Sequence, residues 1–330
     1  MSLSQRLKDW HAVSRVAPAS EDPEVYGGRQ GEKYLHTLLT SHLYFKDASL
    51  FPNKRVPTAH GRREIDLMVV TTKRIHVIEV KNWSGSLRIE GSDWVQTRRD
   101  GTELRHRDLL ADQHEKNTAL MRYVARQGVH LSTDLAARYF CNKVLFMNPR
   151  LDVHSPTITT HPDVLTRGRL DDFLKQQPKK AFGEQMIGSV IQWCLDSDNA
   201  GLVMDGYFGS LPTEKTEAIT AAFDRLSTWD ALHYYGDRIE IGDIIHIVAG
   251  GQLLKRDRFE GKCTYSLGWT RGKTVGIMKA IVGLGPLGCL HYGGGFSTPL
   301  RTDDYVYFDR PGSAGPAKVK LIELDAISVG

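Results

Sequence analysis

Two acidic residues and a lysine stand on neighbouring runs of β-branched residues, at a spacing that could support hydrolysis of a phosphodiester bond. The run that contains Asp66 is followed, across a polar turn at 72–73, by the run that contains Glu79 and Lys81. Two such runs around a polar turn predict an antiparallel hairpin. With the turn centred there, paired positions sum to 145, so Asp66 lies opposite Glu79 and on the same face as Lys81.

Carboxylates that lie directly opposite each other on two strands repel, so a compensating charge is expected. A hard divalent cation such as Mg²⁺ accepts oxygen ligands and often only one or two protein carboxylates. Lys81 could then orient an attacking water or neutralise charge on a phosphate. The alternative is a surface charge cluster in which Glu64 pairs with Lys81 and Asp66 stays solvated. A register shift of one residue would separate the two acids, so the hairpin alone leaves both interpretations open.

A longer set of residues around this hairpin forms a more specific pattern. It consists of Gly31-Glu32, then Asp66, the string Glu79-Val80-Lys81-Asn82-Trp83-Ser84-Gly85, and finally Trp94, Gln113 and Met147-Asn148-Pro149. Over about residues 26–150 the chain resembles the nuclease-related domain (NERD) family of the PD-(D/E)xK nuclease superfamily. The resemblance implies a restriction-endonuclease-like α/β fold, with a mixed sheet flanked by helices.

The resemblance also implies roles for individual residues. Glu32, Asp66, Glu79 and Lys81 match the family's catalytic positions. Asp66, Glu79 and the backbone carbonyl of Val80 match its metal ligands, with Mg²⁺ as the expected cofactor and Mn²⁺ as a substitute. Glu32 would position the metal or its water, and Lys81 would be the catalytic lysine. The implied activity is that of a metal-dependent nuclease that hydrolyses phosphodiester bonds.

Charge around the hairpin favours a polyanionic substrate. Residues 27–81 contain ten Lys and Arg against five Asp and Glu, whereas the whole chain has a net charge of only +4. Concentrated basic charge of this kind is typical of nucleic-acid backbone binding. We assign Arg62 and Arg63 to substrate binding, and we favour DNA over RNA. The resemblance implies that Gln113 either supports the active centre or, as a further substrate-binding residue, contacts the substrate. A catalytically silent nucleic-acid-binding or sensor module with a nuclease-like fold is the alternative function.

The surrounding elements follow from hydrophobic periodicity. Apolar residues at helical spacing predict a helix of about four turns beginning after Tyr26. Further patterns predict an α-β-β-β-α-β order, which indicates a mixed sheet flanked by helices. The remaining elements of this region are strands at 48–56, 64–71, 74–80 and 86–90, a helix at 109–126 and a strand at 139–147.

The flanking regions are predicted to differ in class. Residues 1–25 are expected to be a leader or loop. Residues 151–230 are expected to be a mainly helical connector, with helices at 164–176, 182–195 and 213–226. Residues 231–330 are expected to form a small β-rich domain that could recognise a protein partner or a nucleic-acid end and so target the nuclease. Its predicted strands are 238–241, 244–248, 274–282, 305–308 and 319–324. Its candidate stacking aromatics are Tyr265, Trp269, Tyr305, Tyr307 and Phe308, and the alternative is that most of them belong to the core.

Composition excludes several classes of protein. Of the 330 residues, 41% are hydrophobic and 25% are charged, which is typical of a folded globular chain rather than a disordered or fibrous one. The four cysteines are scattered and form no C-x-x-C pair, so neither a zinc ribbon nor a disulfide framework is indicated. The sequence contains neither a secretory signal pattern nor an apolar run long enough to span a membrane. We therefore expect an intracellular protein, cytoplasmic or nuclear.

Overall fold

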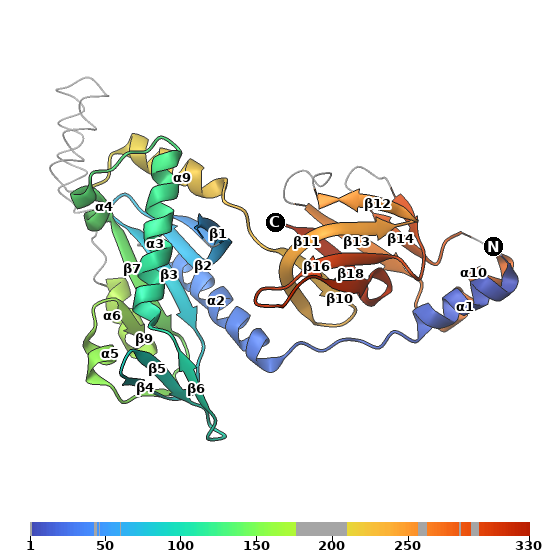
Figure 1. The fold of residues 1–330 in the computed structure, drawn as a ribbon, viewed down its shortest axis with the longest axis horizontal. Helices are drawn as coiled ribbons and strands as arrows, with labels where there is room; N and C mark the ends of the chain where they lie inside the picture. The colour runs from blue at the N-terminus through green and yellow to red at the C-terminus, as the bar shows by residue number, and fades with distance from the viewer. Residues whose placement is uncertain are drawn as a thin grey trace. The chain divides into compact units, whose positions relative to one another are not determined.

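The computed structural model divides the chain into two compact units, each with its own core (Figure 1). One unit consists of residues 24–227, and the other combines residues 1–23 with residues 228–330. The structure describes residues 2–42, 45, 47–59, 61–175, 210–256, 263–283, 285–291 and 297–330. The helix expected at 182–195 lies outside these ranges.

A five-stranded mixed sheet forms the centre of the 24–227 unit, in the order β1-β2-β3-β7-β9. The first three strands are antiparallel, and β3, β7 and β9 are parallel. This arrangement confirms the predicted α/β class and its mixed sheet. The bounds are β1 Ser49–Thr58, β2 Gly61–Val70, β3 Ile75–Lys81, β7 Phe140–Phe146 and β9 Val164–Thr166.

Helices cover both faces of this sheet because its strands are apolar on both sides. On one face, α2 (Pro23–Ser41) and α6 (Arg167–Lys175) share a core with Leu67 and Val69 of β2. On the other, α3 (Leu109–Arg126) and α9 (Thr213–Asp224) share a core with Met68 and Val70. The alternation along β2 therefore sends successive side chains to different helices. Figure 1 shows α2 and α3 flanking the strands.

A second, smaller sheet lies within the same unit and was only partly predicted. It has four strands in the order β6-β5-β4-β8, and β4 alone was expected. The short strands β5, β6 and β8 escaped prediction because runs of three to five residues carry little periodicity. The bounds are β4 Gly85–Glu90, β5 Asp93–Thr97, β6 Glu103–His106 and β8 Leu151–Val153, and the short helices of the unit are α4 Thr133–Tyr139 and α5 Pro156–Thr160.

The other unit is built on a nine-stranded antiparallel sheet, in agreement with the expected β-rich C-terminal region. Its order is β15-β14-β13-β18-β10-β11-β16-β17, with β12 paired to β11. The runs expected at 238–241 and 244–248 are one strand, β11. The bounds are β10 Asp230–Tyr234, β11 Ile239–Ala249, β12 Gln252–Lys255, β13 Cys263–Trp269, β14 Gly288–His291, β15 Ser297–Leu300, β16 Tyr305–Asp309, β17 Ala317–Lys320, η3 Leu321–Glu323 and β18 Leu324–Val329.

Two helices in this unit differ from the expected elements. Residues expected to be a leader or loop contain α1 (Leu3–Ser14), and the strand expected at 274–282 is the helix α10 (Lys273–Val282). Tertiary packing favours a helix at 273–282. Trp10 of α1 packs against Gly276, where an added Cβ would lie only 2.5 Å from the Trp10 ring. Gly283 then ends α10 with a left-handed φ of 76°. Within the described ranges, helices long and apolar enough to cross a membrane are absent.

Candidate active site

The hairpin of β2 and β3 has the register that the sequence predicts. Met68 pairs with Val77 and Val70 with Ile75, so paired positions sum to 145. The backbone ladder ends at the Leu67–Ile78 pair. Just beyond it, the Asp66 carboxylate replaces the ladder by accepting a hydrogen bond from the Val80 N–H at 2.7 Å. Asp66 is therefore bound to the neighbouring strand rather than solvated.

Glu79 lies at the centre of a buried ion-pair cluster. Its Oε1 accepts from Lys81 Nζ at 2.6 Å, and its Oε2 accepts from Lys116 Nζ of α3, also at 2.6 Å. Burial opposes ionisation of Glu79, but the two ammonium groups outweigh it and hold the pKa of this carboxyl below its usual value. Glu79 is therefore ionised at neutral pH, and the structure brings it together with Lys81 as predicted.

The pKa of Asp66 moves in the opposite direction. Burial raises it first, and the negative charge of Glu79 raises it further. The Val80 N–H and the two lysines oppose this rise without reversing it. The predicted repulsion between the two acids is therefore present, and it is expressed as a proton held more tightly by Asp66.

Glu32 of α2 is the third carboxyl of the cluster. Burial raises its pKa to about 7, with a further contribution from the negative charge of Glu64. A hydrogen bond from the Asn53 side chain lowers it in part. Asn53 can reach this position because β1 adopts a left-handed φ of 53° there. A carboxyl that titrates near neutrality is suited to accept or donate a proton at physiological pH.

A cavity of about 500 Å³ joins these acids to the surface of the unit. Glu32, Asp66 and Val80 contribute to its walls, whereas Glu79 and Lys81 do not. The lining also contains basic side chains of α2, namely the cationic Arg29 and Lys33, together with His36. Their spacing of four and three residues places them on the helix face that carries Glu32. The sequence contained this signal, but the predicted substrate residues did not include them.

The residues that follow Lys81 fix α2 and the small sheet against β3. Asn82 Nδ2 donates to Gly27 O at 2.7 Å, and a Cβ on Gly27 would lie only 3.3 Å from Asn82 Nδ2, so glycine there favours the close approach of α2. Trp83 stacks on His106 with ring centroids 4.1 Å apart. Gly85 has a φ of 89°, and a Cβ there would lie 2.0 Å from Thr97 O, so glycine is required. The string after Lys81 thus positions Glu32 near the end of β3.

This region of the chain is similar to a known protein family. Residues 27–147 match the NERD family, described as "Nuclease-related domain". Residues 27–147 are a nuclease-related domain. The resemblance seen in the sequence is thereby confirmed.

A comparison with single proteins gives a shorter match. A segment of 116 residues is 31% identical to a protein described as "Probable kinase PglW" from Streptomyces coelicolor. That segment is 35% of this chain but only 7% of the Streptomyces protein. No solved structure matches the chain.

The predicted substrate residues of the nuclease-related domain lie outside its cavity. Gln113 is buried and donates from Nε2 to Val77 O at 2.8 Å, so it supports β3 from the α3 side. Arg63 pairs with Asp112 and Glu115 of α3. Arg62 donates to Ser227 Oγ at 3.3 Å. All three therefore bind other parts of the same unit.

Lys116 is the functional residue that sequence reasoning missed. It is only 7% exposed, and it lies in the buried stripe of α3 with Gln113, Leu120 and Val124. A lysine within an apolar helical stripe signals a buried ion pair, because an isolated buried ammonium is too costly. The partner could not be identified from the sequence, since Glu79 lies 37 residues away.

The donor set of the nuclease-related domain fits a hard cation. Asp66 uses Oδ2 for Val80, and within the described residues its Oδ1 forms no hydrogen bond. Together with Glu32 it presents carboxylate oxygens to the cavity, the ligand type that Mg²⁺ prefers. Side chains of His, Cys, Asp and Glu do not form a metal-binding group of three or more among the described residues.

The raised pKa of Glu32 predicts a pH-dependent stability. Because the folded-state pKa of about 7 exceeds the usual 4.5, the free energy of unfolding falls as pH rises through this window. Such a shift corresponds to at most about 3 kcal/mol, and solvent screening of this half-buried group reduces it to about 1–2 kcal/mol. Urea unfolding in chelator should therefore show Glu32→Gln more stable than the parent protein at pH 8 and equal to it near pH 4.5.

The matched control is Glu217→Gln, which alters an exposed glutamate of α9 in the same unit. It should leave the stability unchanged at both pH values. Equal pH dependence of the parent and Glu32→Gln proteins would contradict the assignment of this titration to Glu32.

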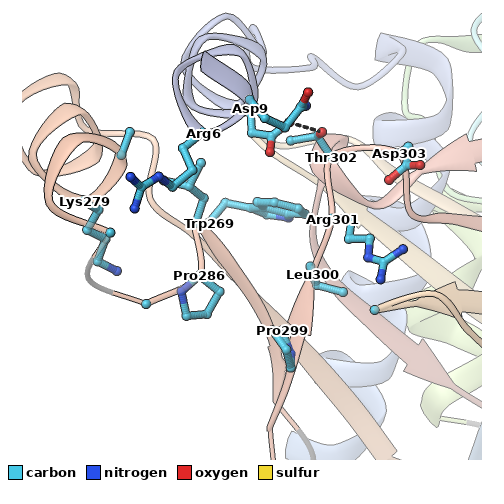
Figure 2. Close-up of a pocket in the computed structure, with 16 residues that line it drawn as sticks. Arg6, Asp9, Trp269, Lys279, Pro286, Pro299, Leu300, Arg301, Thr302 and Asp303 are labelled. Carbon is cyan, nitrogen blue, oxygen red and sulfur yellow. Dashed lines mark hydrogen bonds between the residues drawn. The ribbon is translucent and has the colours of Figure 1, made fainter. Parts of the chain in front are cut away.

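A larger cavity of about 820 Å³ lies in the other unit (Figure 2). Figure 2 shows Arg6 and Lys279 on one side of it, with Trp269 between them and Arg301. Its one acid from α1, Asp9, accepts from Thr302 Oγ1 at 3.0 Å and from Gln5 Nε2 at 2.9 Å. None of the predicted catalytic residues lines this cavity. The residues that could hydrolyse a phosphodiester are gathered in the nuclease-related domain.

Proposed function

We propose that the nuclease-related domain hydrolyses phosphodiester bonds of nucleic acid, with DNA as the favoured substrate. One observation carries the proposal. The cluster of Asp66, Glu79 and Lys81 is largely buried. Its member Asp66 lines a cavity together with Glu32, and cationic side chains line the same cavity. The acids would take part in hydrolysis, and the cationic rim of the cavity would attract a phosphate backbone.

Magnesium is the proposed cofactor, with Mn²⁺ as a substitute. Asp66, Glu79 and the Val80 carbonyl would hold it, with Glu32 beside them. When bound, such an ion neutralises charge on the phosphate and lowers the pKa of water. Burial raises the pKa values of Asp66 and Glu32 most, and repulsion from the negative charge of Glu79 raises both further, which supports a cation here. A cation would relieve that repulsion.

The chain's own residues have separate tasks in the proposed reaction. The pKa of Lys81 is raised because the neighbouring acids Glu79 and Asp66 outweigh its burial, so its ammonium stays charged at neutral pH and can stabilise negative charge on the phosphate. Glu32, with a pKa of about 7, can accept a proton from the attacking water. Arg29 and Lys33 line the cavity and can bind flanking phosphates.

A second candidate function is supported by the state of Glu79. Both of its carboxylate oxygens accept hydrogen bonds from lysines, so its lone pairs are largely occupied. If this ion-pair cluster persists with substrate, the domain would bind nucleic acid without hydrolysing it. The two candidates predict the same salt-sensitive binding and differ in metal binding and in turnover.

The deciding experiment compares substrates and metals. Purified full chain would be incubated with linear DNA, circular DNA and RNA, each with Mg²⁺, Mn²⁺ or chelator. Shortened products that require a divalent metal are the expected result. Salt-sensitive binding without any product would favour the silent module instead. An intracellular site of action stays a prediction, as does targeting by the C-terminal unit.

A further inference from the structure

In the second unit, the sheet has an outer face that points away from the core. Side chains form two rows on this face. Strand pairing places Lys255, His246, Tyr307 and Lys318 side by side across β12, β11, β16 and β17. Directly paired residues project from the same face of a sheet. The next row across the same strands consists of Leu253, Val248, Tyr305 and Lys320.

The opposite face of these strands forms the core. Val306 and Phe308 alternate with the two tyrosines along β16 and are fully buried, as is Ile247 on β11. Tyr305 and Tyr307 are only half-buried. Their rings therefore face outward because of strand alternation, and the interior does not require them.

Only part of the aromatic set predicted from the sequence is available for stacking. Tyr265 and Phe308 are buried in the core. Trp269 donates from Nε1 to Leu321 O at 2.9 Å and is half-buried. The outward rings of β16 are Tyr305 and Tyr307. The structure adds a ring that the sequence analysis had not named, that of His246.

The three rings form one continuous surface. The centroids of His246 and Tyr307 are 4.8 Å apart with planes tilted by 32°. Those of Tyr305 and Tyr307 are 5.6 Å apart, edge to face. Lys318 Nζ lies 3.8 Å from the centre of the Tyr305 ring, so a cation is held directly against the aromatic surface.

The charge on this surface is positive. Lys255, Lys318 and Lys320 are exposed and flank the rings on both sides. The two rows contain no carboxylate. The next pair along these strands is Asp243 and Asp309, and the exposed Asp303 lies two residues before Tyr305. Four strands at about 4.8 Å spacing separate Lys255 from Lys318 by roughly 14 Å. We call the surface made by His246, Tyr305, Tyr307 and these three lysines the aromatic platform.

We infer that the aromatic platform binds unpaired bases of single-stranded nucleic acid. Aromatic side chains stack with bases of any sequence, and a basic surround binds the backbone. Bases inside a duplex are stacked on one another and would have to be extruded to reach a sheet face. The inference goes beyond cleavage and does not require the nuclease-related domain to be active.

The test measures binding of the full chain in chelator, so that cleavage does not interfere. The probe is fluorescein-labelled oligothymidylate of about 12 nucleotides, with its duplex as comparison. Tyr307→Leu keeps an apolar residue of suitable shape but removes the ring, and should weaken single-strand binding about 10-fold. Tyr307→Phe keeps the ring and should bind as the parent does. Adding Tyr305→Leu to Tyr307→Leu should weaken binding further.

A charge-matched pair tests the lysines. Lys318→Glu should weaken binding and reduce its salt dependence, because each neutralised phosphate contributes to the salt slope of a single strand. Lys273→Glu makes the same change at an exposed position on α10 and should have little effect. Ultraviolet cross-linking of an iodouridine-containing oligonucleotide should map to the β16 peptide.

Each outcome decides the inference. Unchanged binding by the Tyr305→Leu, Tyr307→Leu protein would overturn it, as would equal loss with Tyr307→Phe or cross-links confined to residues 24–227. Absence of single-strand binding by the parent protein would also overturn it, and would leave the surface to a protein partner. Normal binding in chelator, together with no product in the separate incubations with Mg²⁺ and Mn²⁺, would instead count against the proposed nuclease activity alone.

Discussion

The Asp66→Asn protein is expected to lose metal-dependent cleavage by at least about 10²–10³-fold, while its fold stays intact. In the parent protein the hydrogen bond from Val80 N–H to Asp66 is 2.7 Å long, and asparagine keeps an oxygen that can accept it. It removes the negative charge that would hold a cation beside the substrate. Because burial and Glu79 already raise the pKa of Asp66, removing that charge should not destabilise the protein. Product formation with Mg²⁺ is measured beside urea unfolding.

Lys81→Met should reduce turnover to a similar extent, because it removes a positive charge rather than a negative one. The methionine retains the length of the side chain but lacks the ammonium that neutralises phosphate charge. Lys175→Met, at an exposed position of α6, provides the matched control and should cleave normally. Full activity of either Asp66→Asn or Lys81→Met would place the catalytic centre elsewhere.

The sequence predicted the hairpin well because its signals are local. The register follows from a turn at 72–73 between two β-branched runs, and the structure pairs Met68 with Val77 accordingly. The helix expected at 109–126 has the observed bounds of α3. In both cases periodicity and a nearby turn or cap are enough to define the element.

Long-range packing determined what the sequence could not predict. Apolar β-branched residues at 274–282 suggested a strand, but contact between Trp10 and Gly276 accompanies a helix there. The hydrogen bond from Val80 N–H to Asp66 could not be predicted, since the ladder could as well have continued. The same holds for the basic rim from α2, which depends on how closely Gly27 lets the helix approach Asn82.

Lys116 gives the largest expected effect on stability. Its ammonium and the Glu79 carboxylate are 2.6 Å apart, with side chains only 8% and 10% exposed. Removing one partner of a buried pair leaves an uncompensated charge. Lys81 still contacts Glu79, so Lys116→Met should lower the free energy of unfolding by about 2–4 kcal/mol. Urea unfolding measures this, and Arg122→Met on the exposed side of α3 should change stability by less than about 0.5 kcal/mol.

A double-mutant cycle separates charge from packing in that loss. Combined with Glu79→Gln, Lys116→Met should cost about 1–3 kcal/mol less than the sum of the two single changes. The pH dependence provides an independent check. Lys116 lowers the pKa of Glu79, so without it this pKa rises in the folded state, and the instability of Lys116→Met should shrink as pH falls through the raised pKa. Additive costs and a pH-independent defect would mean that Lys116 fills space and does not stabilise the Glu79 carboxylate.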